Sequence, residues 1–126
     1  MRTPLMSVAI ASLGFATAAH AVSASEFRDQ LIAETQGDKN TDDHTCRRVR
    51  EFGKGKVTDE RCRAQLESVN SQCRDVAREH IAGVSSQTQA ENLVGILMMC
   101  PIAVILELPF KVRDGKIGVK WSDLPQ

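Results

Sequence analysis

Apolar side chains recur at helical intervals along residues 58–83, the longest regular pattern in the chain. Successive members lie four, three, four and three residues apart: Cys62, Leu66, Val69, Cys73 and Val76. This period places the five side chains on one stripe of a helix. Thr58 is a suitable N-cap, and two acidic residues follow it. The pattern predicts a long helix, roughly 36 Å at 1.5 Å per residue, against which the other elements pack.

Two shorter helices are expected before the long one. Ser23 and Glu26 match a capping box, which opens a short helix that ends at Gly37. The polar residues 37–43 are typical of a loop. A second helix is expected to start near Thr41, with acidic residues in its first turn and arginines near its end, and to stop at a pair of glycines.

A fourth helix is predicted after the long one. Thr88 and Glu91 match a second capping box, which would open this helix. Pro101 is expected to end or kink it, because proline lacks the amide hydrogen and clashes with the preceding turn. The apolar run of residues 93–106 is shorter than the roughly 20 residues that a membrane span needs. We therefore expect this run to be the most buried part of the core.

The pattern changes period at the C-terminus, where residues 108–113 and 116–121 alternate between apolar and polar side chains. Asp114-Gly115 separates the two runs, and Asp-Gly is a strong signal for a type I′ hairpin turn. The resulting register places three apolar pairs on one face: Leu108 with Trp121, Phe110 with Val119, and Val112 with Ile117. Four cations share the other face: Lys111, Arg113, Lys116 and Lys120. The apolar face is expected to close over the helices.

The four cysteines limit the topology. Cys62 and Cys73 are eleven residues apart on one predicted helix, hence about 16 Å apart, which is too far for a disulfide. In an antiparallel helical hairpin Cys46 faces Cys62, and Cys73 then pairs across the next hairpin with Cys100. This pairing is favoured, and the other connectivity stays open: Cys46 with Cys73 and Cys62 with Cys100.

The N-terminus predicts export. Residues 1–21 have the features of a secretory signal peptide: Arg2, an uncharged apolar run and the cleavage motif Ala19-His20-Ala21. Residues 22–24 offer a second cleavage site, and a membrane anchor is disfavoured because the apolar run is short. No cysteine lies near the cleavage site, so lipidation is not expected. The short signal is typical of bacteria and predicts a periplasmic location, where cysteines form disulfides.

The mature chain, residues 22–126, has the length of one domain. Export removes one of 16 basic residues and none of 16 acidic ones, which leaves a net charge of roughly −1. A near-neutral exported chain is a poor candidate for nucleic-acid binding. We therefore expect an α+β domain, mainly α, in which about four helices, stapled by two disulfides, carry a C-terminal hairpin packed on them.

Few residues indicate chemistry. His44, beside Asp42 and Asp43, is a conceivable acid/base group, but a solvated histidine in a polar loop is the favoured interpretation. Glu107 is the one acid in an apolar run, and strand parity predicts that it lies on the basic face and pairs with a lysine there. His80 is expected at the wet edge of the long helix. The sequence lacks the C-x-x-C and H-x-x-x-H spacings and the common catalytic motifs, so we assign no catalytic residue, metal or cofactor.

These features favour a binding protein without catalytic activity whose partner is another protein of the periplasm or envelope. The leading hypothesis is an inhibitor or immunity protein that neutralises a toxin or hydrolase acting on the cell envelope. The candidate contacts are the four hairpin cations and three residues at the end of the polar segment 37–44: Asp42, Asp43 and His44. The competing interpretation of the cations is a solvated face that protects a sheet edge. A periplasmic acid or stress chaperone and a small envelope enzyme are the alternative functions.

Overall fold

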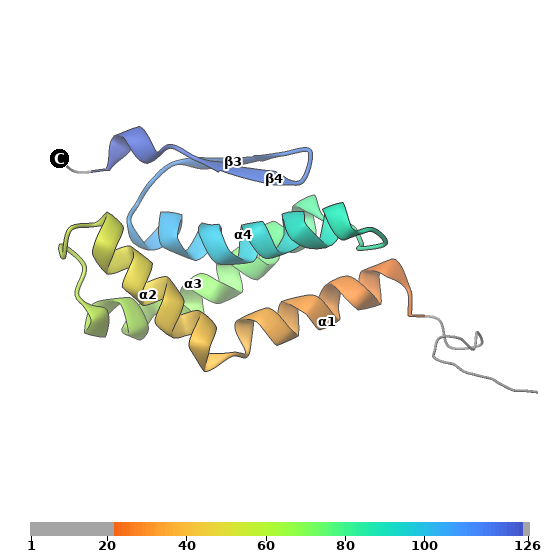
Figure 1. The fold of residues 1–126 in the computed structure, drawn as a ribbon, viewed down its shortest axis with the longest axis horizontal. Coiled ribbons are helices and arrows are strands. Elements are labelled where there is room, and N and C mark those ends of the chain that lie inside the picture. Colours follow the sequence, from red (N-terminus) through yellow and green to blue (C-terminus); the bar gives the residue numbers. More distant parts are fainter. Residues whose placement is uncertain (1–21, 125–126) are drawn as a thin grey trace, which may run out of the picture.

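The computed structural model describes residues 22–124, which form four α-helices and a two-stranded antiparallel hairpin (Figure 1). The elements are α1 (Ala24–Gln36), α2 (Lys39–Phe52), α3 (Asp59–His80), α4 (Gln87–Ile105), β3 (Phe110–Arg113), β4 (Lys116–Val119) and the 3₁₀ turn η2 (Trp121–Asp123). In Figure 1, α4 runs between the hairpin above and α1 below. The predicted fold class is confirmed, whereas the predicted signal peptide, residues 1–21, lies outside the described residues.

The apolar stripe of α3 faces the core, as its spacing predicts. Two members of the stripe are cysteines that tie α3 to its neighbours. Cys62 bonds Cys46 of α2 with a Cα–Cα distance of 5.7 Å, and Cys73 bonds Cys100 of α4 at 5.8 Å. Both distances lie within the range that a disulfide spans. The favoured pairing is therefore confirmed and the alternative connectivity is excluded. All four cysteines are fully buried.

Three side chains cap the starts of α1, α3 and α4. The predicted caps Ser23 and Thr58 are present, since each side-chain oxygen accepts an amide hydrogen of the first turn. The predicted cap Thr88 is wrong, because α4 begins two residues earlier, behind Ser86. Ser86 accepts the amide hydrogen of Gln89 at 3.1 Å, and the Gln89 side chain accepts the amide hydrogen of Ser85, the residue before the cap, at 2.7 Å. The longer helix thus gains a reciprocal cap of its own.

The turn between α1 and α2 is tighter than expected. Gly37 ends α1, and Asp38 at once caps α2 by accepting the amide hydrogen of Asn40 at 2.9 Å. The predicted loop over residues 37–43 is therefore wrong, as is the helix start near Thr41. Polar composition misled the prediction because the exposed first turn of a helix is as polar as a loop, and a side-chain cap makes the helical turn stable.

The helix α4 forms the centre of the domain, where it contacts α3, α1, α2 and β4. Pro101 lies inside α4 and the helix continues to Ile105, so of the two predicted effects, ending or kinking the helix, the first is wrong. An interior proline costs about 3 kcal/mol, and burial of the surrounding apolar turn offsets that cost. By length and composition α4 is also long and apolar enough to cross a membrane, and 44% of its apolar stretch is buried inside the protein. The buried core helix of a water-soluble domain meets the same criterion.

A side chain of α1 fixes the end of α3. The helix stops at His80 rather than continuing to Gly83. Arg28, with a side chain only 14% exposed, donates Nη1 hydrogen bonds of 3.1 Å to the carbonyl groups of Ile81 and Ala82. These carbonyls follow the helix and would otherwise lack helical partners. A charged donor makes a strong hydrogen bond to such carbonyls. Arg28 therefore connects α1 to the end of α3.

The connection from α3 to α4 passes directly over the start of α1. The Val84 amide donates a 2.9 Å hydrogen bond to the carbonyl oxygen of Ala24. A Cβ atom at Gly83 would lie 2.7 Å from the Ala24 Cβ and 3.1 Å from its carbonyl carbon. Gly83 is therefore needed for this close approach.

Removing either disulfide should lower the free energy of unfolding by about 3 kcal/mol, because each bond restricts a loop in the unfolded chain. The paired replacements are Cys46→Ser with Cys62→Ser, and Cys73→Ser with Cys100→Ser. Urea unfolding followed by circular dichroism measures the change. A loss smaller than about 1 kcal/mol for both pairs would contradict the role given to these bonds.

Gly83→Ala should destabilise the domain by about 1–3 kcal/mol, since the added methyl group overpacks the contact with Ala24. Gly118→Ala is the matched control, because a Cβ at Gly118 meets nothing within 4 Å. The same urea titration compares the two variants. Equal stabilities would show that the connection moves freely and that the close approach is not a constraint.

Candidate binding surface on the C-terminal hairpin

The Asp114-Gly115 turn builds the hairpin as its sequence predicts. Both residues have positive φ, 54° and 79°, as a type I′ turn requires. Strands β3 and β4 pair with Phe110 opposite Val119 and Val112 opposite Ile117. The inward-facing residues of both strands are half-buried and the others exposed. The alternation places the apolar face on α4, which contacts β4.

The predicted third pair, Leu108 with Trp121, is wrong. The ladder ends with the Lys120 amide donating to the Pro109 carbonyl at 2.9 Å. Trp121 then opens η2, and its ring packs edge-on against Phe52 of α2 with centroids 5.2 Å apart. Leu108 is buried beneath the start of β3. Trp121 therefore packs edge-to-face on Phe52 instead of forming one more cross-strand pair with Leu108.

Glu107 shapes the entry to the hairpin. It has a positive φ of 58° at the end of α4. The Glu107 amide donates to the Val104 carbonyl at 3.1 Å and the Leu108 amide to the Ala103 carbonyl at 2.8 Å, which are the two bonds of a Schellman motif. The prediction that strand parity aims Glu107 at a lysine is wrong, since the residue precedes the strand and makes no ion pair with any residue of 22–124.

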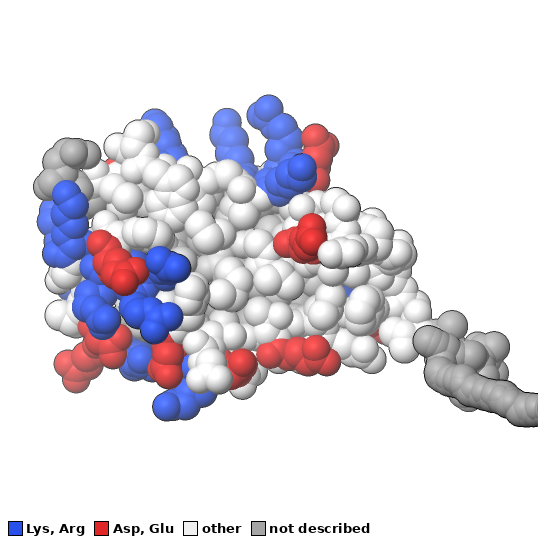
Figure 2. All heavy atoms as spheres, viewed as in Figure 1, with Lys and Arg blue, Asp and Glu red and all other residues white. Residues whose placement is uncertain are grey.

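The outer face of the hairpin carries the four predicted cations, all of them exposed: Lys111, Arg113, Lys116 and Lys120. Figure 2 shows mainly basic side chains projecting from the upper edge of the molecule, where the hairpin lies, with an acidic side chain beside them. The lower left of the same view mixes basic and acidic side chains. The hairpin therefore concentrates one sign of charge on one face of a nearly neutral chain.

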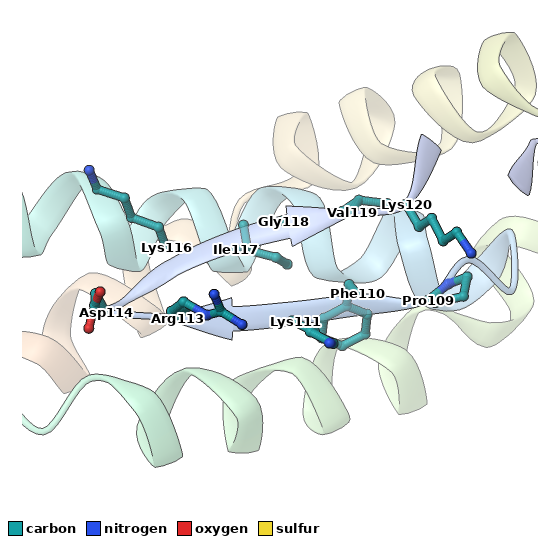
Figure 3. Close-up of a pocket in the computed structure, with 10 residues that line it drawn as sticks. All are labelled: Pro109, Phe110, Lys111, Arg113, Asp114, Lys116, Ile117, Gly118, Val119 and Lys120. Atoms are coloured by element: carbon teal, nitrogen blue, oxygen red, sulfur yellow. The ribbon is translucent and has the colours of Figure 1, made fainter. Parts of the chain in front are cut away.

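A hollow of about 650 Å³ lies over the hairpin and is lined by both of its strands (Figure 3). All four cations belong to its lining. Gly118 sits opposite Lys111 in the ladder, and a Cβ there would meet open space. The missing side chain thus leaves room between the flanking lysines. The hairpin tip adds Asp114, and Pro109 lies at the entry to β3.

Most of this positive charge is unbalanced. Lys120 has an acidic partner, Asp123, at 3.7 Å. Within residues 22–124, no carboxylate lies within ion-pair distance of the other three cations: Lys111, Arg113 and Lys116. Arg113 lies directly opposite Lys116 in the ladder. Like charges in that arrangement destabilise a sheet by a few tenths of a kcal/mol to about 1 kcal/mol.

The other predicted contacts lie elsewhere. Asp42, Asp43 and His44 belong to the first turns of α2, at the bottom of Figure 1, with the hairpin at the top. The Asp43 carboxylate already pairs with Arg63 Nη1 at 2.8 Å. Hydrogen bonds from Arg63 to Asp59 and Asp43 raise the pKa of this guanidinium further above its usual value. These residues do not join the hairpin cations in one site, and the charge of Asp43 is already paired.

A second, smaller hollow of about 330 Å³ lies where α1 and α2 meet α3. Its lining includes Asp42, Arg63 and Arg74. Arg74 donates a 2.8 Å hydrogen bond to Gln36 Oε1, and Gln36 Nε2 is buried with no partner among residues 22–124. Both signs of charge meet here, so the hollow does not favour an anion or a cation. We give it no binding role.

The residues that the structure describes contain no cluster of three or more potential metal ligands among His, Cys, Asp and Glu. All four cysteines are bonded in pairs, so none is a thiolate ligand or nucleophile. His80 is exposed, as predicted. The sequence prediction missed Gly118 and Pro109, although the parity that exposed the cations also places both of these on the outer face.

No protein-family model, curated protein or solved structure matches this chain.

Glu107→Gly should stabilise the domain by about 0.5–1 kcal/mol, because glycine adopts a positive φ without steric cost. Glu107→Ala is the control, since alanine keeps the steric cost and should change stability by less than about 0.5 kcal/mol. Urea unfolding at neutral pH distinguishes the two. If the alanine variant gained as much as the glycine variant, the carboxylate and not the backbone would be the source of the destabilisation.

Proposed function

We propose that this chain is an exported, non-enzymatic binding protein of the periplasm that recognises an acidic surface on another envelope protein. Within that class we favour an inhibitor or immunity protein that blocks a toxin or hydrolase acting on the cell envelope. The contact surface is the outer face of the hairpin, defined by Lys111, Arg113, Lys116 and Lys120.

One observation carries the proposal: three of the four cations lack an acidic partner within residues 22–124, and two of the three face each other across the ladder. Elsewhere in the domain, cations such as Arg63 and Arg78 are paired with carboxylates. A partner that brings carboxylates to the hairpin would relieve this repulsion and form charge-assisted hydrogen bonds. The repulsion therefore favours a complex over the free protein.

The covalent framework supports the compartment. Two fully buried disulfides are compatible with an oxidising environment outside the cytoplasm. They also favour a rigid scaffold, in which a hairpin is held in shape before it meets a partner. A preformed surface loses less conformational entropy on binding than a flexible one. This is the property that an inhibitor of another protein needs.

The experiment is a pull-down of periplasmic and envelope proteins with the tagged mature chain at pH 7. The test variant replaces three cations with glutamate: Lys111, Arg113 and Lys116. The matched control makes the same change at three exposed cations that are also without acidic partners among residues 22–124: Lys54, Lys56 and Arg61. The hairpin variant should weaken capture of a stoichiometric partner by about tenfold or more, whereas the control should keep it.

Repeating the pull-down at higher ionic strength and at lower pH separates the proposal from its alternatives. Capture that depends on the hairpin charges should weaken as ionic strength rises. Equal capture by the two triple variants would contradict the hairpin as the contact surface. A protein that bound nothing at pH 7 and held many unrelated clients only in acid would contradict the proposal as a whole, and would match an acid-stress chaperone instead.

A further inference from the structure

The outer edge of β3 offers unpaired backbone groups. In an antiparallel ladder, successive residues alternate between bonding the partner strand and pointing away from it. The bond from the Lys120 amide to the Pro109 carbonyl fixes this alternation. It directs the amide and carbonyl groups of Phe110 and Val112 away from β4.

Within residues 22–124, no hydrogen bond occupies that edge or reaches the outward groups of Phe110 and Val112. Helix α4 packs against β4, and no helix packs comparably against β3. Unpaired groups of this kind form a template for another extended chain. The open edge is therefore that of β3.

The charges beside this edge indicate the sequence of the added strand. Lys111 and Arg113 lie two residues apart on the outer face, a spacing of roughly 7 Å. A strand paired with β3 would lie about 4.8 Å away and present every second side chain on that same face. Carboxylates at alternate positions would meet the two cations directly. Lys116, opposite Arg113, would extend the positive surface behind them.

We propose that the β3 edge binds an extended segment of the partner protein that carries carboxylates at alternate positions, added as a third strand of the hairpin. This inference rests on the proposed function and specifies how the same surface is used. The backbone edge supplies hydrogen bonds, and the cations select an acidic sequence. The hollow over the outer face, which Lys111 and Arg113 help to line, leaves room for glutamate side chains to lie across β3.

Two other occupants fit the surface less well. A second copy of this chain, paired edge to edge through β3, would bring Lys111 and Arg113 of one copy beside those of the other, and the like charges would repel. A membrane surface favours exposed aromatic anchors beside its cations. Here Phe110 and Trp121 pack inward against the core instead.

The test uses synthetic peptides and the mature chain with both disulfides intact. The first probe is a short peptide that alternates glutamate and threonine. The second has the same sequence with N-methyl groups on every second amide, at the positions whose N–H groups would point toward β3. N-methylation removes hydrogen-bond donors and keeps every charge. Fluorescence anisotropy measures affinity, and amide chemical shifts locate the contact.

Strand addition predicts that the first peptide binds, that N-methylation weakens it by about tenfold or more, and that the amide signals of Phe110 and Val112 shift most. The control is a peptide methylated at the other amides, whose N–H groups would point away from β3, and it should bind like the unmethylated peptide. A peptide alternating lysine and threonine should not bind. Gly118→Val, which fills the hollow without crowding the ladder, should weaken the acidic peptide and leave the domain folded.

The remaining outcomes overturn the inference in separable ways. If both N-methylated peptides bind as well as the parent, the acidic surface contact stands and strand addition is wrong. If no acidic peptide binds while the glutamate triple variant still loses its partner in the pull-down, strand addition fails and the proposed function survives. If only vesicles of anionic phospholipid bind the hairpin, both proposals fail.

Discussion

The two disulfides fix α3 at two points of one buried stripe, and the rest of the architecture depends on that constraint. Cys62 holds α2 against the first half of the helix and Cys73 holds α4 against the second half. A chain with few aromatic residues and a small core gains much of its stability from such bonds. Because both bonds lie on α3, the neighbouring helices have little freedom to slide along it.

The position of α4 follows from this arrangement and determines that of the hairpin. Held on α3 by Cys100, the helix still has an apolar side that α1, α2 and α3 do not cover. The hairpin covers part of it with the apolar residues of β3 and β4. A hairpin used as a lid has one face committed to the core. Its other face and its β3 edge remain available, and the polar face is where the cations lie.

Local rules predicted the features that a single short pattern determines. The period of the α3 stripe gave the long helix and excluded the Cys62–Cys73 bond, and Asp114-Gly115 gave the turn and the register. The errors arose where two local solutions compete and tertiary contacts select one. Ser86 and Thr88 are both plausible caps. Ser86 is the one used, and it comes two residues after Val84, whose amide is held by the Ala24 carbonyl.

The ends of the helices are hard to predict for a related reason. Glu107 occupies a left-handed position where glycine is usual, so no glycine marks the motif in the sequence. Lys54 does the same after α2, with the Gly55 amide bonding the Arg50 carbonyl at 2.9 Å. In both places the cost of the backbone conformation is offset by hydrogen bonds that only the folded helix end provides. The candidate surface was easier to predict, because strand parity alone places its cations.

The basic face of the hairpin conflicts with the rest of the domain in a way that packing does not explain. Several cations of the helices have carboxylate partners, as in the contact of Arg63 with both Asp43 and Asp59. On β3 and β4 the fold instead keeps Arg113 opposite Lys116. Lysines that merely protect a sheet edge need not face another cation across the ladder. Local choices that oppose the stability of a fold are expected where the surface serves a partner, and this conflict lies beside β3, against which no helix packs as α4 packs against β4.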